Sequence, residues 1–156
     1  MRQWKYFITH FRKMSRQRFQ NSRICSPPEV QFEEWALVYE SRTVGYMIAL
    51  FTDDIAYFLH LAVAEECRGK GFGSRAIEFF NRKFASHLIF FAVETPSEDA
   101  ENQWQRLARI RLYERYGYRL AGIDILDDGT PFSVMCRSTA SEEDIRKNPC
   151  IYGSYG

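Results

Sequence analysis

The chain has 156 residues, of which 46% are hydrophobic and 26% are charged. These values are typical of a soluble globular protein with a real core and the length of one domain. The formal net charge of +1 at pH 7 gives no overall preference for nucleic acids, membranes or acidic partners. No apolar run approaches the ~20 residues that span a bilayer.

The first 28 residues differ from the rest of the chain in charge. No acidic residue precedes Glu29. We interpret this part as helical, with its aromatic side packed on the domain; the alternative is contact with RNA or a membrane surface. It lacks the apolar run of a signal peptide, so we expect a cytoplasmic protein. Its basic residues are Arg2, Lys5, Arg12, Lys13, Arg16, Arg18 and Arg23.

The four cysteines show neither a redox pair nor a metal-binding pattern. No two of them are separated by two residues, and no histidine stands at ligand spacing. We therefore expect reduced thiols and no bound metal. The cysteines are Cys25, Cys67, Cys136 and Cys150.

Pro27 and Pro28 end the helical part, because two prolines prevent a helix from continuing. The pattern that follows predicts a β-hairpin. The predicted strands are 35–39 and 44–51. A long strand follows over 55–64, and its almost continuously apolar sequence indicates burial on both faces.

A first core helix is predicted from Gly71 to Ala85, followed by an apolar strand over 87–93. One stripe of the helix collects its apolar residues at helical spacing. These residues are Ala76, Ile77, Phe80 and Phe84.

A second helix is predicted from Thr95 to about Tyr116. Thr95 can cap it, Pro96 suits the first helical position, and Glu98 completes a capping box. Gly117 supplies the stop. The expected buried stripe is Trp104, Leu107, Ala108 and Leu112.

The last part of the domain is predicted to be a β-hairpin. Strands 118–125 and 131–137 are predicted to form a hairpin around an Asp-Asp-Gly turn. The order of elements predicts an α/β protein, an α+β sandwich built around a mixed sheet. One short helix is expected after Ser141.

We divide the chain accordingly. Residues 1–140 form a single domain with a helical N-terminal part, 1–28, and a core, 35–138. Residues 141–156 form a C-terminal tail.

The segment Arg68-Gly69-Lys70-Gly71-Phe72-Gly73-Ser74 carries the clearest chemical signal. Glycines let backbone amides converge on an anion, the helix that follows favours negative charge at its start, and Arg68 and Lys70 add charge. This pattern is typical of a pyrophosphate site; a tight strand–helix turn is the alternative. The alternating glycines fit neither the Walker nor the dinucleotide fingerprint.

Two motifs make the interpretation specific. Arg68-x-x-Gly71-x-Gly73, after the strand Leu61-Ala62-Val63, resembles the coenzyme A signature of the Gcn5-related N-acetyltransferase (GNAT) family. Leu112-Tyr113-Glu114-Arg115-Tyr116-Gly117-Tyr118 resembles the family's aromatic-Tyr-x-x-x-Gly-aromatic motif. The resemblance covers roughly residues 35–138. It implies the acyl-CoA N-acyltransferase fold, a mostly antiparallel central sheet flanked by helices.

The resemblance also implies roles for individual residues. Backbone groups of Leu61 and Val63 would bind the pantetheine of acetyl-CoA, with the Leu61 N–H near the thioester oxygen. Tyr113, which points about 100° away from Leu112, would donate a proton to the departing thiolate; packing on the cofactor is the alternative. The pyrophosphate would be held by Arg68, Gly69, Lys70, Gly71, Gly73 and Ser74.

The sequence identifies the general base less clearly than the residues above. Some relatives place a glutamate on the strand before the glycine loop, where this chain has Tyr57 and Leu59. We favour Glu94, a carboxylate at the end of an apolar strand; stabilisation of the following helix is its alternative role. His60 or water could also serve, although we expect His60 to be a packed core histidine.

The sequence therefore predicts an N-acetyltransferase that moves an acetyl group from acetyl-CoA to a primary amine by direct transfer in a ternary complex. The acceptor would be a small molecule, a peptide or a protein, with no metal, no membrane and no nucleic acid required. The rivals are a non-catalytic acyl-CoA-binding module and a transferase whose basic N-terminus binds RNA. A homodimer stays open, and Cys67 is expected to be a bystander.

Overall fold

The computed structural model describes residues 7–10, 30–137 and 139–146. They form a seven-stranded sheet in the order β1-β2-β3-β4-β5-β7-β6, and every neighbouring pair except β4–β5 is antiparallel. This is the mixed, mostly antiparallel α/β architecture predicted from the sequence. The elements are β1 (Phe7–His10), β2 (Gln31–Tyr39), β3 (Arg42–Phe51), β4 (Ile55–Val63), a 3-10 turn (Glu65–Cys67), α1 (Phe72–Lys83), β5 (Leu88–Glu94), α2 (Gln103–Glu114), β6 (Tyr118–Asp127), β7 (Thr130–Arg137) and α3 (Glu142–Arg146).

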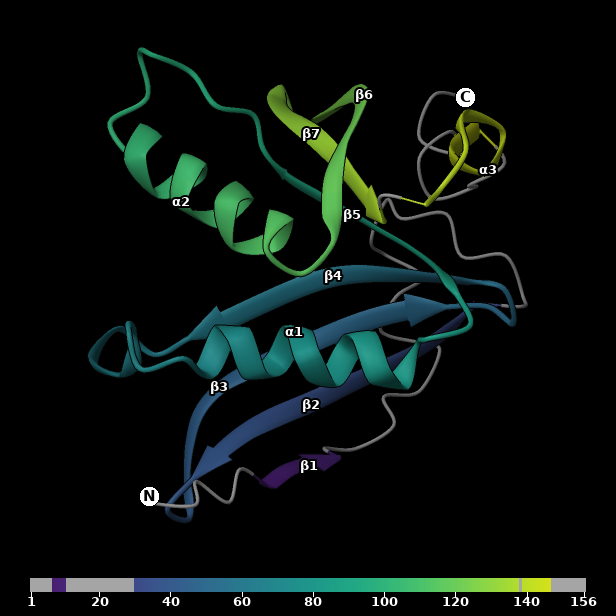
Figure 1. Ribbon diagram of the computed structural model, residues 1–156. Coiled ribbons are helices and arrows are strands. Elements are labelled where there is room, and N and C mark those ends of the chain that lie inside the picture. The colour runs from purple at the N-terminus through teal and green to yellow at the C-terminus, as the bar shows by residue number, and fades with distance from the viewer. Residues whose placement is uncertain (1–6, 11–29, 138, 147–156) are drawn as a thin grey trace.

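The sheet divides between its two central strands. The parallel strands β4 and β5 pair only at Ile55↔Leu88, Ala56↔Ile89 and Tyr57↔Phe90. Beyond these pairs the strands separate, so β2–β4 and β5–β7 form two halves that diverge toward the carboxyl ends of β4 and β5 (Figure 1). The second half of β4 consequently has a neighbour only on its β3 side.

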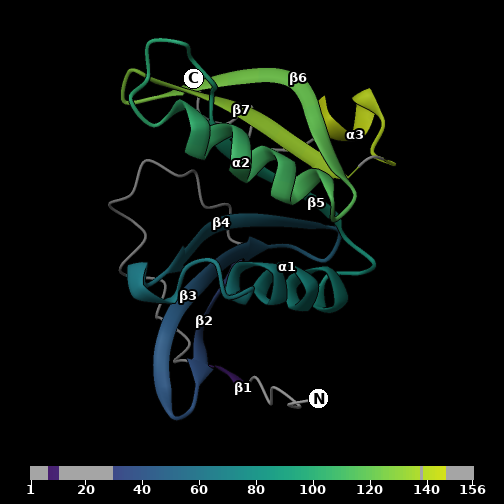
Figure 2. The same ribbon diagram turned by 60° about the vertical axis from the view of Figure 1, so that its left-hand side comes forward.

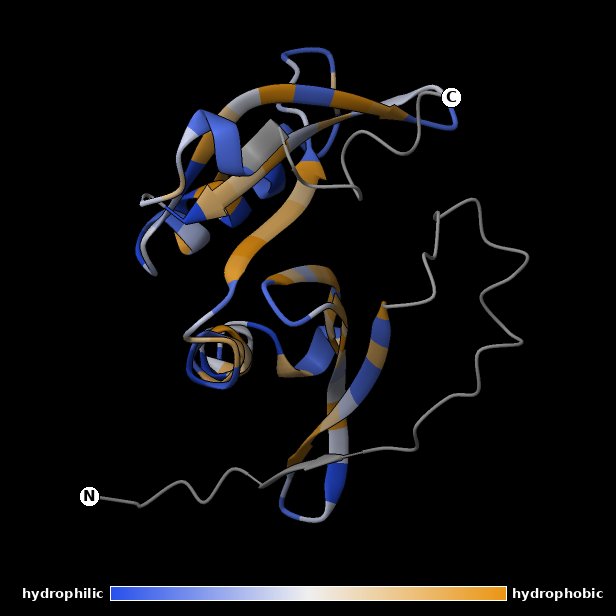
Figure 3. Ribbon diagram, turned by 90° about the vertical axis from the view of Figure 1, so that its right-hand side faces the viewer, coloured by the Kyte–Doolittle hydropathy of each residue, from blue (hydrophilic) through white to orange (hydrophobic). Residues whose placement is uncertain are grey.

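Helices α1 and α2 cover the same face of the sheet (Figure 2). The first packs on β3 and β4 and the second on β5 and β6, and one aromatic core joins them. The predicted apolar stripe of α1 is buried in this core. Strand β5 links the halves and is hydrophobic through most of its length (Figure 3). A smaller cluster on the opposite face contains Phe90, Val134, Cys136 and Ala140.

The second helix differs from its prediction in both start and orientation. It begins at Gln103, and residues 95–102 are irregular, with turns at 98–99 and 101–102. Thr95 extends the sheet instead of capping a helix, because its N–H donates to Pro131 O (3.1 Å) and its hydroxyl bonds Ser133 (3.0 Å). Of the expected stripe, Leu112 packs against the core, but Trp104 is 69% exposed and Ala108 is exposed as well. The buried residues of α2 are Ile110 and Tyr113.

A β-bulge corrects the prediction for His60. The register passes from Ile48↔His60 to Ala49↔Phe58, which leaves Leu59 as an extra residue on β4. His60 is exposed and stacks on Tyr46 with ring centroids 5.3 Å apart. The expectation of a core histidine is therefore wrong. Burial on both faces holds only for the first half of β4, where Ile55 and Tyr57 pack on the smaller cluster.

The structure describes only part of the two terminal segments, so it tests only some of the predictions made for them. Residues 7–10 form strand β1, so the helical assignment of 1–28 is wrong there. The rest of that part, including its proposed RNA contact, lies outside the described residues, as do residues 147–156 of the tail. The short helix expected after Ser141 is α3. Within the described chain no helix is long and apolar enough to cross a membrane.

Gly45 on β3 leads to a stability prediction. A Cβ added there would lie 2.3 Å from the backbone oxygen of Ala62 on β4. Because backbone cannot yield as a flexible side chain can, we expect Gly45→Ala to lower the free energy of unfolding by about 2–3 kcal/mol. Urea unfolding measures it. Gly73→Ala is the control, since nothing lies within 4 Å of that position; equal stability of the two variants would contradict the prediction.

Candidate active site

The open edge of β4 presents main-chain hydrogen-bonding groups to the split in the sheet. The N–H of Ala64 donates to Val44 O on β3 (2.9 Å). Because successive amides of an extended chain point to opposite sides, the N–H groups of Leu61 and Val63 point away from β3, toward the split. The predicted pantetheine-binding residues thus lie on the edge that β5 leaves uncovered.

The glycine loop lies directly beyond this edge. Gly69 and Gly71 have φ angles of +73° and +84°, which favour glycine, and Gly71 is the N-cap of α1. Phe72 anchors the loop, being 4% exposed and packed on Tyr39. No described side chain caps α1, so the amides of Gly73 and Ser74 in its first turn are available for an anion.

Two cations flank these amides. Arg68 and Lys70 are both exposed, and Arg68 Nε donates to Val63 O (3.4 Å), which places the guanidinium over the end of β4. Ser74 lies in the first turn of α1. The residues predicted to hold the pyrophosphate are therefore brought together at one end of the split.

Tyr113 lies where β4 and β5 separate. Its ring contacts Phe58 on β4 (centroids 6.3 Å apart) and Phe91 on β5 (4.4 Å). These two residues directly follow the last parallel pair, Tyr57↔Phe90. The ring is 6% exposed, and no described residue hydrogen-bonds its hydroxyl, whereas the neighbouring Tyr118 hydroxyl donates to Asn81.

Burial makes both phenols hard to ionise. It raises the pKa of Tyr113 to about 12, against a smaller opposing effect of Arg109. It raises the pKa of Tyr118 as well, although Arg137 opposes the change. At neutral pH Tyr113 is therefore a protonated hydrogen-bond donor.

This shift predicts an alkaline loss of stability. Since the folded state holds the Tyr113 proton more tightly than the unfolded chain, the stabilisation is complete below about pH 10 and declines between pH 10 and 12. Tyr113 should account for about 2 kcal/mol of the loss by pH 12. Urea unfolding of wild type and Tyr113→Phe across this range measures it. A loss as steep in the variant as in wild type would contradict the assignment.

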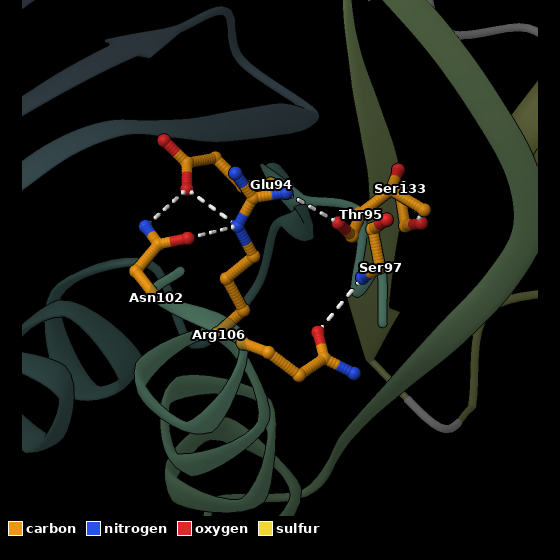
Figure 4. A network of polar contacts seen from close by, with 7 residues as sticks. Glu94, Thr95, Ser97, Asn102, Arg106 and Ser133 are labelled. Atoms are coloured by element: carbon orange, nitrogen blue, oxygen red, sulfur yellow. Dashed lines mark hydrogen bonds and ion pairs between the residues drawn. The ribbon is translucent and has the colours of Figure 1, made fainter. Parts of the chain in front are cut away.

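Glu94 is held at the end of β5 by residues of α2 and its N-cap. Its Oε2 lies 3.0 Å from Arg106 Nε and accepts a hydrogen bond from Asn102 Nδ2 (3.3 Å). Figure 4 shows this group beside Thr95, whose carbonyl accepts from Arg106 Nη1 (2.8 Å). The carboxylate side chain is 35% exposed, so it is both anchored and accessible.

The other candidates lie elsewhere. His60 stands on the face of β4 opposite Leu61, which packs against the core. Cys67 is half-buried against that core, and its role as a bystander stays a prediction. In the described part of the chain no three His, Cys, Asp or Glu side chains gather as metal ligands would.

A split sheet with an uncovered strand edge and a glycine-rich loop before α1 matches the architecture that the sequence resemblance to acyl-CoA-dependent transferases predicted. The acetyltransferase (GNAT) domain family matches residues 32–120. The chain belongs to the GNAT family. A search of curated proteins found no match.

Solved structures share the fold. A Bacteroides thetaiotaomicron protein described as a GNAT-family acetyltransferase superposes with a TM-score of 0.62 at 23% identity, covering 88% of this chain and 76% of its own. A Bacillus subtilis acetyltransferase in complex with CoA gives 0.57 at 15%, covering 87% and 100%. Arabidopsis thaliana Naa50, bound to the bisubstrate analogue CoA-Ac-MVNAL, gives 0.55 at 19%, covering 67% and 72%.

Sequence reasoning missed Asn102 and Arg106. A usable signal was present, because Arg106, Ile110 and Tyr113 stand at i, i+4 and i+7 and share one helix face. The apolar residues around Trp104 drew the assignment to the opposite face.

Proposed function

We propose that this protein transfers an acetyl group from acetyl-CoA to a primary amine by direct attack within a ternary complex. The observation that carries the proposal is the position of Tyr113, whose ring touches both strands where the sheet opens. The free edge of β4 would align the pantetheine there, with the pyrophosphate at the Arg68–Ser74 loop.

In this proposal Glu94 acts on the attacking amine and Tyr113 acts on the departing sulfur. The amine attacks the thioester carbonyl, a C–N bond forms, and the C–S bond breaks. Glu94 takes the proton from the amine, directly or through water, and Tyr113 donates to the departing sulfur. The Leu61 N–H would stabilise the negative charge that develops on the thioester oxygen.

A base is needed because of the acceptor's own chemistry. A lysine-like amine has a pKa near 10.4, so only about one molecule in 10³ is neutral at pH 7. Removing that proton costs about 4–5 kcal/mol without assistance. Glu94 is the ionisable side chain that combines partial exposure with a place at the end of β5, beside the split.

The acceptor class remains broad. The titles of the structural neighbours include a peptide-based bisubstrate analogue and an IAA acetyltransferase. We propose an amine-bearing small molecule, peptide or protein as the acceptor here. Cytoplasmic location and homodimerisation stay predictions from the sequence.

Two measurements on the full chain test the proposal. Calorimetry with CoA and acetyl-CoA should detect binding. Binding should weaken roughly tenfold in Arg68→Gln/Lys70→Gln, because both side chains are exposed and an exposed ion pair contributes about 0.2–1 kcal/mol. A free-thiol assay with acetyl-CoA and a panel of small amines, aminoglycosides, amino acids and peptides should then show release of CoA. Absence of heat with either form of the cofactor overturns the proposal; binding without turnover for any amine supports the non-catalytic rival.

A further inference from the structure

Both contacts to the Glu94 carboxylate fall on a single oxygen. Arg106 Nε and Asn102 Nδ2 approach Oε2 at 3.0 and 3.3 Å. No described residue forms a hydrogen bond or ion pair with Oε1, which points away from both partners in Figure 4. The side chain is 35% exposed, so the second oxygen is open to a molecule in the split.

The two partners are themselves fixed. Arg106 Nε donates to Asn102 Oδ1 (2.8 Å) and Nη1 donates to Thr95 O (2.8 Å). Thr95 is tied to β7 through Pro131 and Ser133. The guanidinium therefore links the first turn of α2 to the sheet, and the carboxylate is held against a rigid support.

This geometry differs from that of an ion pair optimised for stability. An arginine and a carboxylate pair most strongly through two parallel N–H···O bonds that use both oxygens. Here Arg106 uses Nη1 on a main-chain carbonyl and leaves Oε1 open. This arrangement suits a general base, because one oxygen is held in place while the other is left to reach the proton.

We propose that Arg106 and Asn102 are positioning residues that hold Glu94 by Oε2 and direct Oε1 to the acceptor amine. The inference rests on the proposed function and deepens its account of the base. Neither residue contacts the reacting atoms; both act through Glu94.

Replacement of Arg106 gives the first test. Arg106→Met should lower kcat roughly tenfold, because the base loses its fixed orientation, while KM for acetyl-CoA stays within about twofold because the glycine loop is untouched. Arg106→Lys should recover part of kcat, since it keeps the charge without the planar fork. Arg111→Met is the matched control on the same helix; Arg111 is exposed and its replacement should leave kcat unchanged.

A double-mutant cycle separates positioning from a general structural effect. In a Glu94→Gln background Arg106→Met should cause no further loss of kcat, because the base it orients is gone. Losses that multiply, or an Arg106→Met enzyme with wild-type kcat, overturn the inference. Asn102→Ala removes the second anchor of Glu94 and the Asn102 acceptor of Arg106 Nε, but leaves Arg106 bound to Thr95 O. It should lower kcat by a smaller factor, so the test holds even where Arg106→Met folds poorly.

Failure of the inference and failure of the proposed function give different results. A wild-type protein without acetyl transfer to any amine overturns the proposed function. A Glu94→Gln enzyme with wild-type kcat overturns Glu94 as base. Only when both tests succeed does the Arg106 cycle decide between positioning and independent action.

Discussion

Tyr113→Phe is expected to lower kcat between about 10²- and 10³-fold while the dissociation constant of acetyl-CoA changes less than about threefold. Phenylalanine keeps the ring contacts with Phe58 and Phe91, so the shape of the split is preserved. Only the donor to the departing sulfur is lost. Steady-state kinetics with the free-thiol assay, together with calorimetry, measure the two quantities.

The raised pKa defines what this hydroxyl can do. A thiol ionises near 8.5, so complete proton transfer from a phenol of pKa about 12 to a thiolate is uphill by about 3–4 pKa units. We therefore expect Tyr113 to act mainly as a hydrogen-bond donor to sulfur as charge develops in the transition state. This is why the expected effect lies in the lower part of the usual range for acid catalysis.

Tyr118→Phe is the matched control for this effect. The same hydroxyl is removed from a neighbouring ring, 6.3 Å away between centroids, but this one donates to Asn81. The variant should lose about 1 kcal/mol of stability and keep its kcat. Equal losses of kcat in the two variants would show that the aromatic core, and not the Tyr113 hydroxyl, supports turnover.

The glycine loop could be predicted from the sequence because its signal is local. Positive φ at Gly69 and Gly71, the charges of Arg68 and Lys70 and the start of α1 lie within a few adjacent residues. Local propensity and structure agree there, so no distant contact is needed to interpret the segment. The strand order was not predicted, since the pairing of β5 with β7 joins strands with α2 and β6 between them.

The start of α2 could not be predicted in this way. Thr95-Pro96-Ser97-Glu98 fits a capping box, but the Thr95 hydroxyl bonds Ser133, 38 residues away. A long-range contact thus overrides the local pattern. The bulge at Leu59 is of the same kind, because it depends on how β4 pairs with β3, and it decides that His60 is exposed.

Glu94 lies between these two cases. A carboxylate at the end of an apolar strand indicated a special role, and in the structure it contacts Arg106 and Asn102. Its contacts with Arg106 and Asn102 could not be inferred, because the sequence analysis directed the Trp104 face of α2 to the core. The candidate base was thus visible in the sequence as an anomaly, whereas the contacts that hold it depend on tertiary packing.

Gly71→Ala is expected to weaken acetyl-CoA binding roughly 10²-fold. Gly71 has a φ of +84° and nothing within 4 Å of an added Cβ, so the cost arises from backbone strain and not from a clash. A left-handed alanine costs about 1–2 kcal/mol, and relaxation of the loop would also turn amides away from the diphosphate, at about 1.5–3 kcal/mol for each charged hydrogen bond. Calorimetry with acetyl-CoA measures the change.

Gly73→Ala makes the comparison decisive. The substitution is the same, it lies two residues away, and again nothing lies within 4 Å, but Gly73 is already in α1 and has no positive φ. We expect near-wild-type affinity, since alanine suits a helix. If both variants bind acetyl-CoA alike, the left-handed turn at Gly71 does not contribute to the anion site.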